Sequence, residues 1–135
     1  MTSIALTLLL GLAGLGIDIG RMYVIRAELQ SFTDAAALSA AREIDGTNSG
    51  LDRARAGATR LANGPHAMHW DMGTQPITNI STSFSTSQAG IPCVRVVATE
   101  RAPIIFLRLF QPLTSTTVAA ASVAEKSGAS VRLVQ

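Results

Sequence analysis

The stretch IALTLLLGLAGLGIDIGRMYVIRAELQSFTDAAALSAA, residues 4–41, decides the fold of this 135-residue chain. It contains no proline, and its second half is rich in alanine and other helix formers, so we expect one helix from Thr2 to Asp45. At about 1.5 Å per residue, such a helix of about 44 residues is about 66 Å long, twice the roughly 30 Å of a bilayer core. Its first half suits lipid and its second half is amphipathic.

The run from Ile4 to Ile17 has no charged residue and lies near the lower limit of a membrane-spanning length. A secretory signal is the competing interpretation, but its only small-residue cleavage pattern is the loose Gly14-Leu15-Gly16, so we favour a retained anchor. Arg21 and Arg26 follow the run, although basic residues normally mark the cytoplasmic side. We therefore expect Met1 to be the first residue left by a processing peptidase; a cytoplasmic C-terminal side is the alternative.

Composition limits the classes of protein to which this chain could belong. Eleven basic residues against nine acidic ones give a net charge of +2, and the arginines are scattered, so we expect no nucleic-acid partner. Cys93 is the single cysteine and cannot form an intramolecular disulfide. We expect two parts, an anchor and assembly helix over residues 1–45 and a small α+β head over residues 46–135.

The second half of the long helix carries an apolar stripe at steps of three or four residues, which predicts the surface on which the head packs. The stripe consists of Met22, Ile25, Leu29, Phe32, Ala36, Ala40 and Ile44. Charged residues lie on the other faces, where solvent or a neighbouring subunit would meet them. They are Arg21, Arg26, Glu28, Asp34 and Arg42.

The first half of the helix holds four glycines, Gly11, Gly14, Gly16 and Gly20. Each costs about 1 kcal/mol relative to alanine in a helix, so a compensating role is expected. Gly16 and Gly20 form a G-x-x-x-G step, which permits close helix packing in lipid or in a bundle.

The helices and strands of the head are predicted from turn-forming residues and from changes in residue composition along the chain. Asp45 and Gly46 should end the first helix, and a second helix should begin at a cap on Asn48 or Ser49 and run to Ala62. A loop over residues 64–76 should then lead to a sheet of three or four strands, with Val94, Val96 and Ala98 on one buried face. The strands are expected at residues 77–86, 93–100, 116–124 and 130–134. Pro103 should open a short helix, IIFLRLF, that covers an edge or end of the sheet.

The block from Asp18 to Ala41 resembles the TadE/TadG-like family of Flp (tight adherence) pilus proteins. The matching residues are Asp18, Gly20, Arg21, Tyr23, Arg26, Leu29, Gln30 and the run from Asp34 to Leu38; VRVVATERAPIIFLRLF and TTVAAASVA resemble its C-terminal half. The resemblance implies a membrane-anchored, pilin-like protein of a bacterial cell-surface appendage.

Two departures from related proteins matter. Ala5 stands where the usual type IV pilin has a glutamate that pairs with a neighbour's N-terminal amine, if Met1 is the mature terminus. The D-x-S-x-S metal motif of long TadG-like chains is absent from the sequence, so adhesion by that route is not expected.

Asp18 and Arg21 are the residues on which function most depends in this interpretation. Three positions apart on a helix, they could pair within the chain at the membrane boundary, or either could pair across subunits in a filament core. The proposed set of assembly and helix-packing residues is Gly11, Gly14, Gly16, Asp18, Gly20, Arg21, Tyr23, Arg26, Gln30 and Asp34.

Catalysis and metal binding have weak candidates. His66, His69 and Asp71 could be drawn together as a zinc site, but they lie in a glycine- and proline-bounded loop, where Met68 and Trp70 more plausibly cover the core. Cys93 has no histidine partner at a defined spacing and is expected to be a small buried residue. The sequence has no P-loop, G-x-S-x-G or H-E-x-x-H motif, so we expect no enzyme, no cofactor and no metal.

Three hypotheses remain. The first is a structural subunit that forms homo-oligomers through its N-terminal helix, held in the bacterial inner membrane before assembly and then part of a surface filament. The second is a membrane-anchored minor pilin or accessory protein that works with other pilus assembly proteins without polymerising. The third is an anchored extracytoplasmic binding domain.

Overall fold

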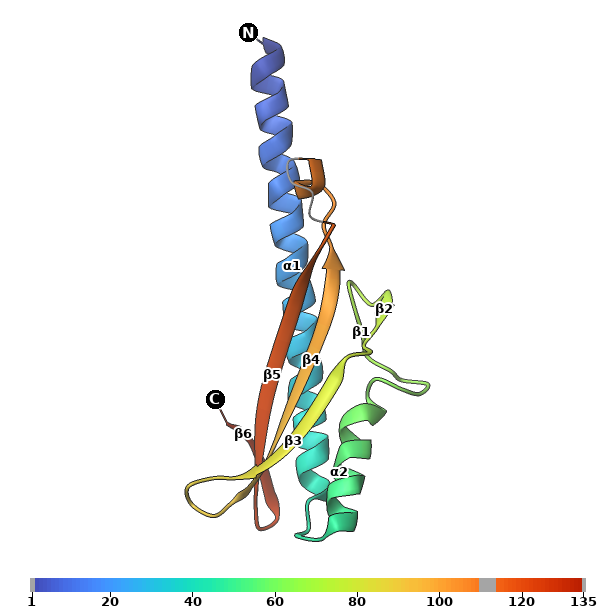
Figure 1. The fold of residues 1–135 in the computed structure, drawn as a ribbon, viewed down its shortest axis with the longest axis vertical. Coiled ribbons are helices and arrows are strands. Elements are labelled where there is room, and N and C mark those ends of the chain that lie inside the picture. Colours follow the sequence, from blue (N-terminus) through green and yellow to red (C-terminus); the bar gives the residue numbers. More distant parts are fainter. Residues whose placement is uncertain (1, 110–113, 135) are drawn as a thin grey trace.

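The computed structural model describes residues 2–109 and 114–134, and the side chains of residues 5–108 and 114–134. The fold is α+β, as predicted: a long N-terminal helix, a second helix and two antiparallel sheets of two and four strands. Helix α1 (Thr2–Glu43) follows the long axis of the molecule, and its N-terminal half projects beyond the main sheet, with only the end of the β4-β5 hairpin beside it (Figure 1).

Helix α1 ends at Glu43, two residues before the predicted end, and Gly46 adopts the left-handed conformation (φ 84°) that a glycine stop requires. Lys126 closes this end of the helix, because its Nζ donates to the carbonyl oxygens of Arg42 (2.8 Å) and Ile44 (2.6 Å). Helix α2 (Asn48–Arg60) then folds back along α1 (Figure 1).

The N-cap of α2 is Thr47, which corrects the cap predicted at Asn48 or Ser49. The Thr47 hydroxyl accepts the N–H of Gly50 at 3.0 Å, which satisfies one of the free donors of the first turn. Asp45 in turn accepts the backbone N–H and the hydroxyl of Thr47 and pairs with Arg53. The connection between the two helices is therefore fixed by side chains.

The main sheet has the order β3-β4-β5-β6 and consists of β3 (Ile80–Thr86), β4 (Pro92–Pro103), β5 (Ser115–Ser127) and β6 (Ser130–Val134). Strand β3 begins three residues later than predicted, whereas β4 and β5 extend beyond their predicted ends. They form one long hairpin, paired from Cys93 opposite Glu125 to Pro103 opposite Ser115. The hairpin lies along α1 and climbs toward its projecting half (Figure 1).

The loop predicted over residues 64–76 contains a small hairpin that the sequence did not indicate, made of β1 (His69–Trp70) and β2 (Gln75–Pro76). Its turn places Asp71 and Met72 at positive φ (57° and 58°), which non-glycine residues seldom adopt. Trp70 is buried, and its indole N–H donates to the carbonyl of Pro76 at 3.0 Å. Trp70 and the half-buried Met68 cover the core, as predicted.

The core lies between α1, α2 and one face of the sheet. The predicted stripe of α1 is buried from Ile25 to Ile44, with Phe32 fully enclosed. Val94, Val96 and Ala98 of β4 are buried against it, which confirms the predicted face of that strand. Cys93 is also buried, as expected. The core of the head therefore includes the second half of the same helix whose first half projects from it.

Candidate assembly and membrane surface

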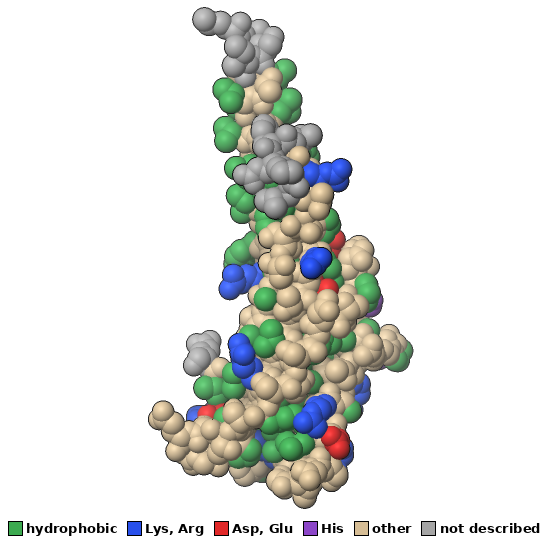
Figure 2. All heavy atoms as spheres, viewed as in Figure 1, with side chains coloured by type: hydrophobic (Ala, Val, Ile, Leu, Met, Phe, Trp, Pro, Cys, Tyr) green, Lys and Arg blue, Asp and Glu red, His purple; other side chains and the backbone are tan. Residues whose placement is uncertain are grey.

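The N-terminal half of α1 exposes apolar side chains on every side except the one that faces Phe106 and Leu107. Seven of them are between 53 and 66% exposed: Leu6, Leu8, Leu9, Leu10, Leu12, Ile17 and Ile19. Figure 2 shows hydrophobic side chains along both sides of this end. A helix that is apolar all round is stable when lipid or other helices surround it. Over the described residues, this one helix is long and apolar enough to cross a membrane.

Asp18 is 3% exposed, and its partners are backbone groups of its own chain. Its carboxylate accepts the N–H groups of Ile105 (3.2 Å), Phe106 (2.8 Å) and Leu107 (2.7 Å). These residues follow β4 and lead into the short 3-10 helix η1 (Leu107–Leu109), which takes the place of the predicted short helix. Asp18 therefore fastens the end of the long hairpin to α1.

Arg21 binds Asp71 and not Asp18. Its Nε donates to Oδ1 of Asp71 at 2.8 Å and its Nη2 to Oδ2 at 2.5 Å, while Nη1 reaches the carbonyl oxygen of Pro103 at 3.2 Å. The two side chains are 18 and 11% exposed. This two-point pair joins α1 to the turn of the β1-β2 hairpin, so both charges that follow the apolar run have partners within the chain.

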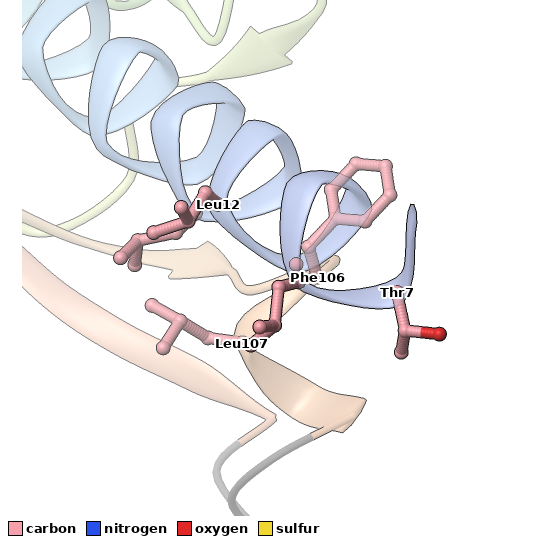
Figure 3. Close-up of a pocket in the computed structure, with 7 residues that line it drawn as sticks. Thr7, Leu12, Phe106 and Leu107 are labelled. Atoms are coloured by element: carbon pink, nitrogen blue, oxygen red, sulfur yellow. The ribbon is translucent and has the colours of Figure 1, made fainter. Parts of the chain in front are cut away.

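Gly14 permits close contact between α1 and the end of the long hairpin. A Cβ atom at Gly14 would lie 2.7 Å from the ring of Phe106, so a larger residue here would force the two apart. Beside this contact is an apolar groove of about 330 Å³ between α1 and residues 106 and 107. Figure 3 shows Phe106 and Leu107 against the helix, with Leu12 and Thr7 along its length. The groove is lined by Thr7, Leu8, Gly11, Leu12, Leu15, Phe106 and Leu107.

Gly16 and Gly20 behave differently, because a Cβ atom at either would meet nothing within 4 Å. With Leu12 and Tyr23 they lie at helical spacings of three or four residues, so the four share one side of α1. Leu12 is 66% and Tyr23 77% exposed. We call Leu12, Gly16, Gly20 and Tyr23 the open stripe. Arg26, one turn further on, is also exposed.

Gln30 and Asp34, predicted as assembly residues, bind β5 of their own chain. The Gln30 amide donates to the hydroxyl of Ser122 at 2.9 Å, and that hydroxyl donates to Asp34 at 2.5 Å. The hydroxyl of Thr33 lies 2.8 Å from the same Ser122 oxygen. This polar cluster sits where sheet and helix meet, so in the protomer it holds the head on α1.

The proposed metal ligands are not assembled. Asp71 is engaged by Arg21, and Nδ1 of His69 lies 2.9 Å from the carbonyl of Ala67. Within residues 2–109 and 114–134, no group of three potential ligands could hold a metal ion.

Two family models match the chain. One, described as Flp pilus-assembly TadE/G-like, matches residues 1–43, and the other, described as Tad-like Flp pilus-assembly, matches residues 24–124. The first covers α1, and the second extends from the middle of α1 through most of β5. No curated protein and no solved structure matches the chain.

Proposed function

Because the chain belongs to the Tad-like Flp pilus-assembly family, we propose that it is a structural, pilin-like subunit of a bacterial surface filament. In this proposal the N-terminal half of α1 anchors the subunit in the inner membrane and later packs with other copies in the filament. The family points to a role in assembly and not in catalysis.

The observation that carries the proposal is the projecting helix. Its apolar side chains are exposed on every side except the one that faces Phe106 and Leu107, and little of its most apolar stretch is buried within the chain. Such a surface needs either lipid or a bundle of similar helices around it. A filament of N-terminal helices with heads outside gives it the second environment.

Packing must favour the transfer of the helix from lipid to a bundle. Lipid is already apolar, so the hydrophobic effect does not drive the helix out of it. The open stripe supplies the means, since Gly16 and Gly20 leave the backbone of α1 accessible to a neighbouring helix. Asp18 and Arg21 add no unpaired charge to such a bundle, because both have partners within the chain.

A second candidate is a minor pilin or accessory protein that anchors in the membrane without polymerising. It is favoured by the apolar run from Ile4 to Ile17, which offers no charged side chain for pairing with a neighbouring subunit. Asp18 follows that run, and its carboxylate already accepts three N–H groups. A charge pair between Asp18 and a neighbouring subunit would have to displace these three hydrogen bonds.

Negative-stain microscopy of the purified full chain, after detergent is removed, tests the proposal. The structural-subunit function predicts helical arrays made of this chain alone, with heads on the outside. Discrete particles or proteoliposomes without filaments, at all protein concentrations, would favour the accessory role. Co-purification with other pilus assembly proteins would then identify its partners.

A further inference from the structure

The end of the β4-β5 hairpin lies beside the apolar half of α1. We call residues 104–107 the hairpin tip. Phe106 and Leu107 of the tip line a groove whose other wall runs from Thr7 to Leu15, and Asp18 holds the base of the tip. At about 1.5 Å per residue, Thr7 and Asp18 are about 16 Å apart along the helix. The tip therefore occupies the same levels as much of the apolar run.

The tip has the properties of a segment that enters lipid. Ile105 is 53% exposed, and Phe106 and Leu107 are half-buried against α1. Irregular backbone is tolerated at membrane depth only where the protein itself satisfies its polar groups. The N–H of Ile104 donates to the carbonyl of Thr114 at 3.1 Å, and the next three N–H groups donate to Asp18. Four consecutive donors are thus satisfied within the chain.

The charges around the tip suit a phospholipid surface. Arg26, Arg101 and Arg108 are exposed, whereas Asp18 and Asp71 are buried and occupied. Arg26 lies beside Thr116 and Thr117 of β5, and Thr117 is opposite Arg101 in the sheet, so these two arginines lie at one level near the base of the tip. Exposed cations at such a level are attracted to lipid phosphates.

We propose that the hairpin tip is a second membrane-contacting element, inserted beside α1 into the leaflet that faces the head. The arginines at its base contact lipid phosphates, and Asp18 supplies the hydrogen bonds that water would otherwise make. This inference rests on the membrane stage of the proposed function and adds to it that the head itself contacts the bilayer.

Site-specific fluorescence in proteoliposomes tests the inference with the full chain. Cys93 is first replaced by alanine, and single cysteines are then introduced as Ile105→Cys in the tip, Leu12→Cys in the anchor and Ser127→Cys at the exposed end of β5. Each variant is labelled with an environment-sensitive dye and placed in vesicles of phosphatidylcholine and phosphatidylglycerol. Quenching by nitroxide-bearing lipids is compared with quenching by aqueous iodide.

We expect the labels at positions 105 and 12 to be quenched by the nitroxide lipids and protected from iodide, and the label at 127 to show the reverse. If the label at position 105 is quenched by iodide, like the label at position 127, while the label at position 12 is in lipid, the inference is overturned. Membrane anchoring by α1 is then still supported. If the label at position 12 is also in water, the proposed membrane anchoring by α1 is wrong as well. Protection of position 105 from both quenchers would show that protein covers the tip, which also overturns the inference.

Discussion

Arg21 of α1 and Asp71 of the β1-β2 turn form a two-point ion pair across 50 residues of sequence, with Nε···Oδ1 at 2.8 Å and Nη2···Oδ2 at 2.5 Å. Asp71 has a positive φ, so the pair also holds a backbone conformation that an aspartate seldom adopts. The pair attaches the turn of this hairpin to α1, together with the N–H of Met72, which donates to Oε2 of Glu28 at 3.1 Å.

Replacing Arg21 by alanine should lower the free energy of unfolding by about 3 kcal/mol, because it leaves the mostly buried Asp71 carboxylate without its partner. Arg21→Lys should recover part of this loss, since lysine keeps the charge but cannot make the two parallel hydrogen bonds. Urea unfolding of the full chain in mild detergent, followed by Trp70 fluorescence, measures both. Equal stability of Arg21→Ala and the unmodified chain would show that the pair contributes nothing.

Replacing Asp18 by alanine should free the hairpin tip while the lower head stays folded. The N–H groups of residues 105, 106 and 107 lose their acceptor, at a cost of about 1–3 kcal/mol for each donor left buried. Hydrogen exchange of these amides should become much faster, while the amides of α2 keep their protection. Asp18→Asn should have a smaller effect, because the amide oxygen still accepts. Unchanged exchange at all three amides in Asp18→Ala would contradict this role.

The glycines of α1 should separate into two classes. Gly16→Leu and Gly20→Leu should not destabilise the protomer, because the added Cβ atoms meet open space and leucine favours the helix by up to about 1 kcal/mol over glycine. They should nevertheless prevent filaments by blocking close helix packing. The matched control is Gly14→Leu, which should destabilise the protomer because Phe106 occupies that space. Thermal unfolding in detergent and negative-stain microscopy give the two readouts. Normal filaments from Gly16→Leu would remove the open stripe from the interface.

Asp45 should make the free energy of unfolding depend on pH in the acidic range. Hydrogen bonds from Thr47, followed by the pairing with Arg53, lower the pKa of Asp45 from 3.8 to about 2 in the folded protein. A lowered pKa means that the contribution is fully present above pH 3.8 and is lost as the pH falls through about 2. The difference in unfolding free energy between the unmodified chain and Asp45→Asn should therefore shrink over this interval. A difference that stays constant down to pH 2 would rule the effect out.

The parts of the fold that sequence predicts are those set by local periodicity. The stripe of α1 repeats every three or four residues, so its buried positions from Ile25 to Ile44 follow from the pattern, and the alternation of Val94, Val96 and Ala98 marks the buried face of β4. The small hairpin was missed because its turn depends on positive φ at Asp71 and Met72, for which the local sequence gives little signal. The N-cap lies one residue before the nearer of its two predicted positions, because Thr47, like Asn48 and Ser49, has a side-chain oxygen that can accept from the first turn.

The sequence singles out individual residues of the candidate site, but it does not reveal which groups they contact. Asp18 and Arg21 stand out because they follow an apolar run, yet their partners lie 87 to 89 and 50 residues away in sequence. Such contacts depend on how the long hairpin and the small hairpin dock on α1, which spacing along one helix cannot reveal. The same is true of Gln30 and Asp34, whose partner Ser122 belongs to β5.

The long hairpin is fastened to α1 at both of its ends, by Asp18 near the tip and by Lys126 at the opposite end, where it caps the helix. A pulling force between the N-terminal half of α1 and the head therefore acts along the strands. The force acts in shear on the hydrogen bonds between β4 and β5 and on the packing of the hairpin against α1. All of these contacts bear the force at the same time. A protein held in this way would resist tension along its whole head, without first separating from one end.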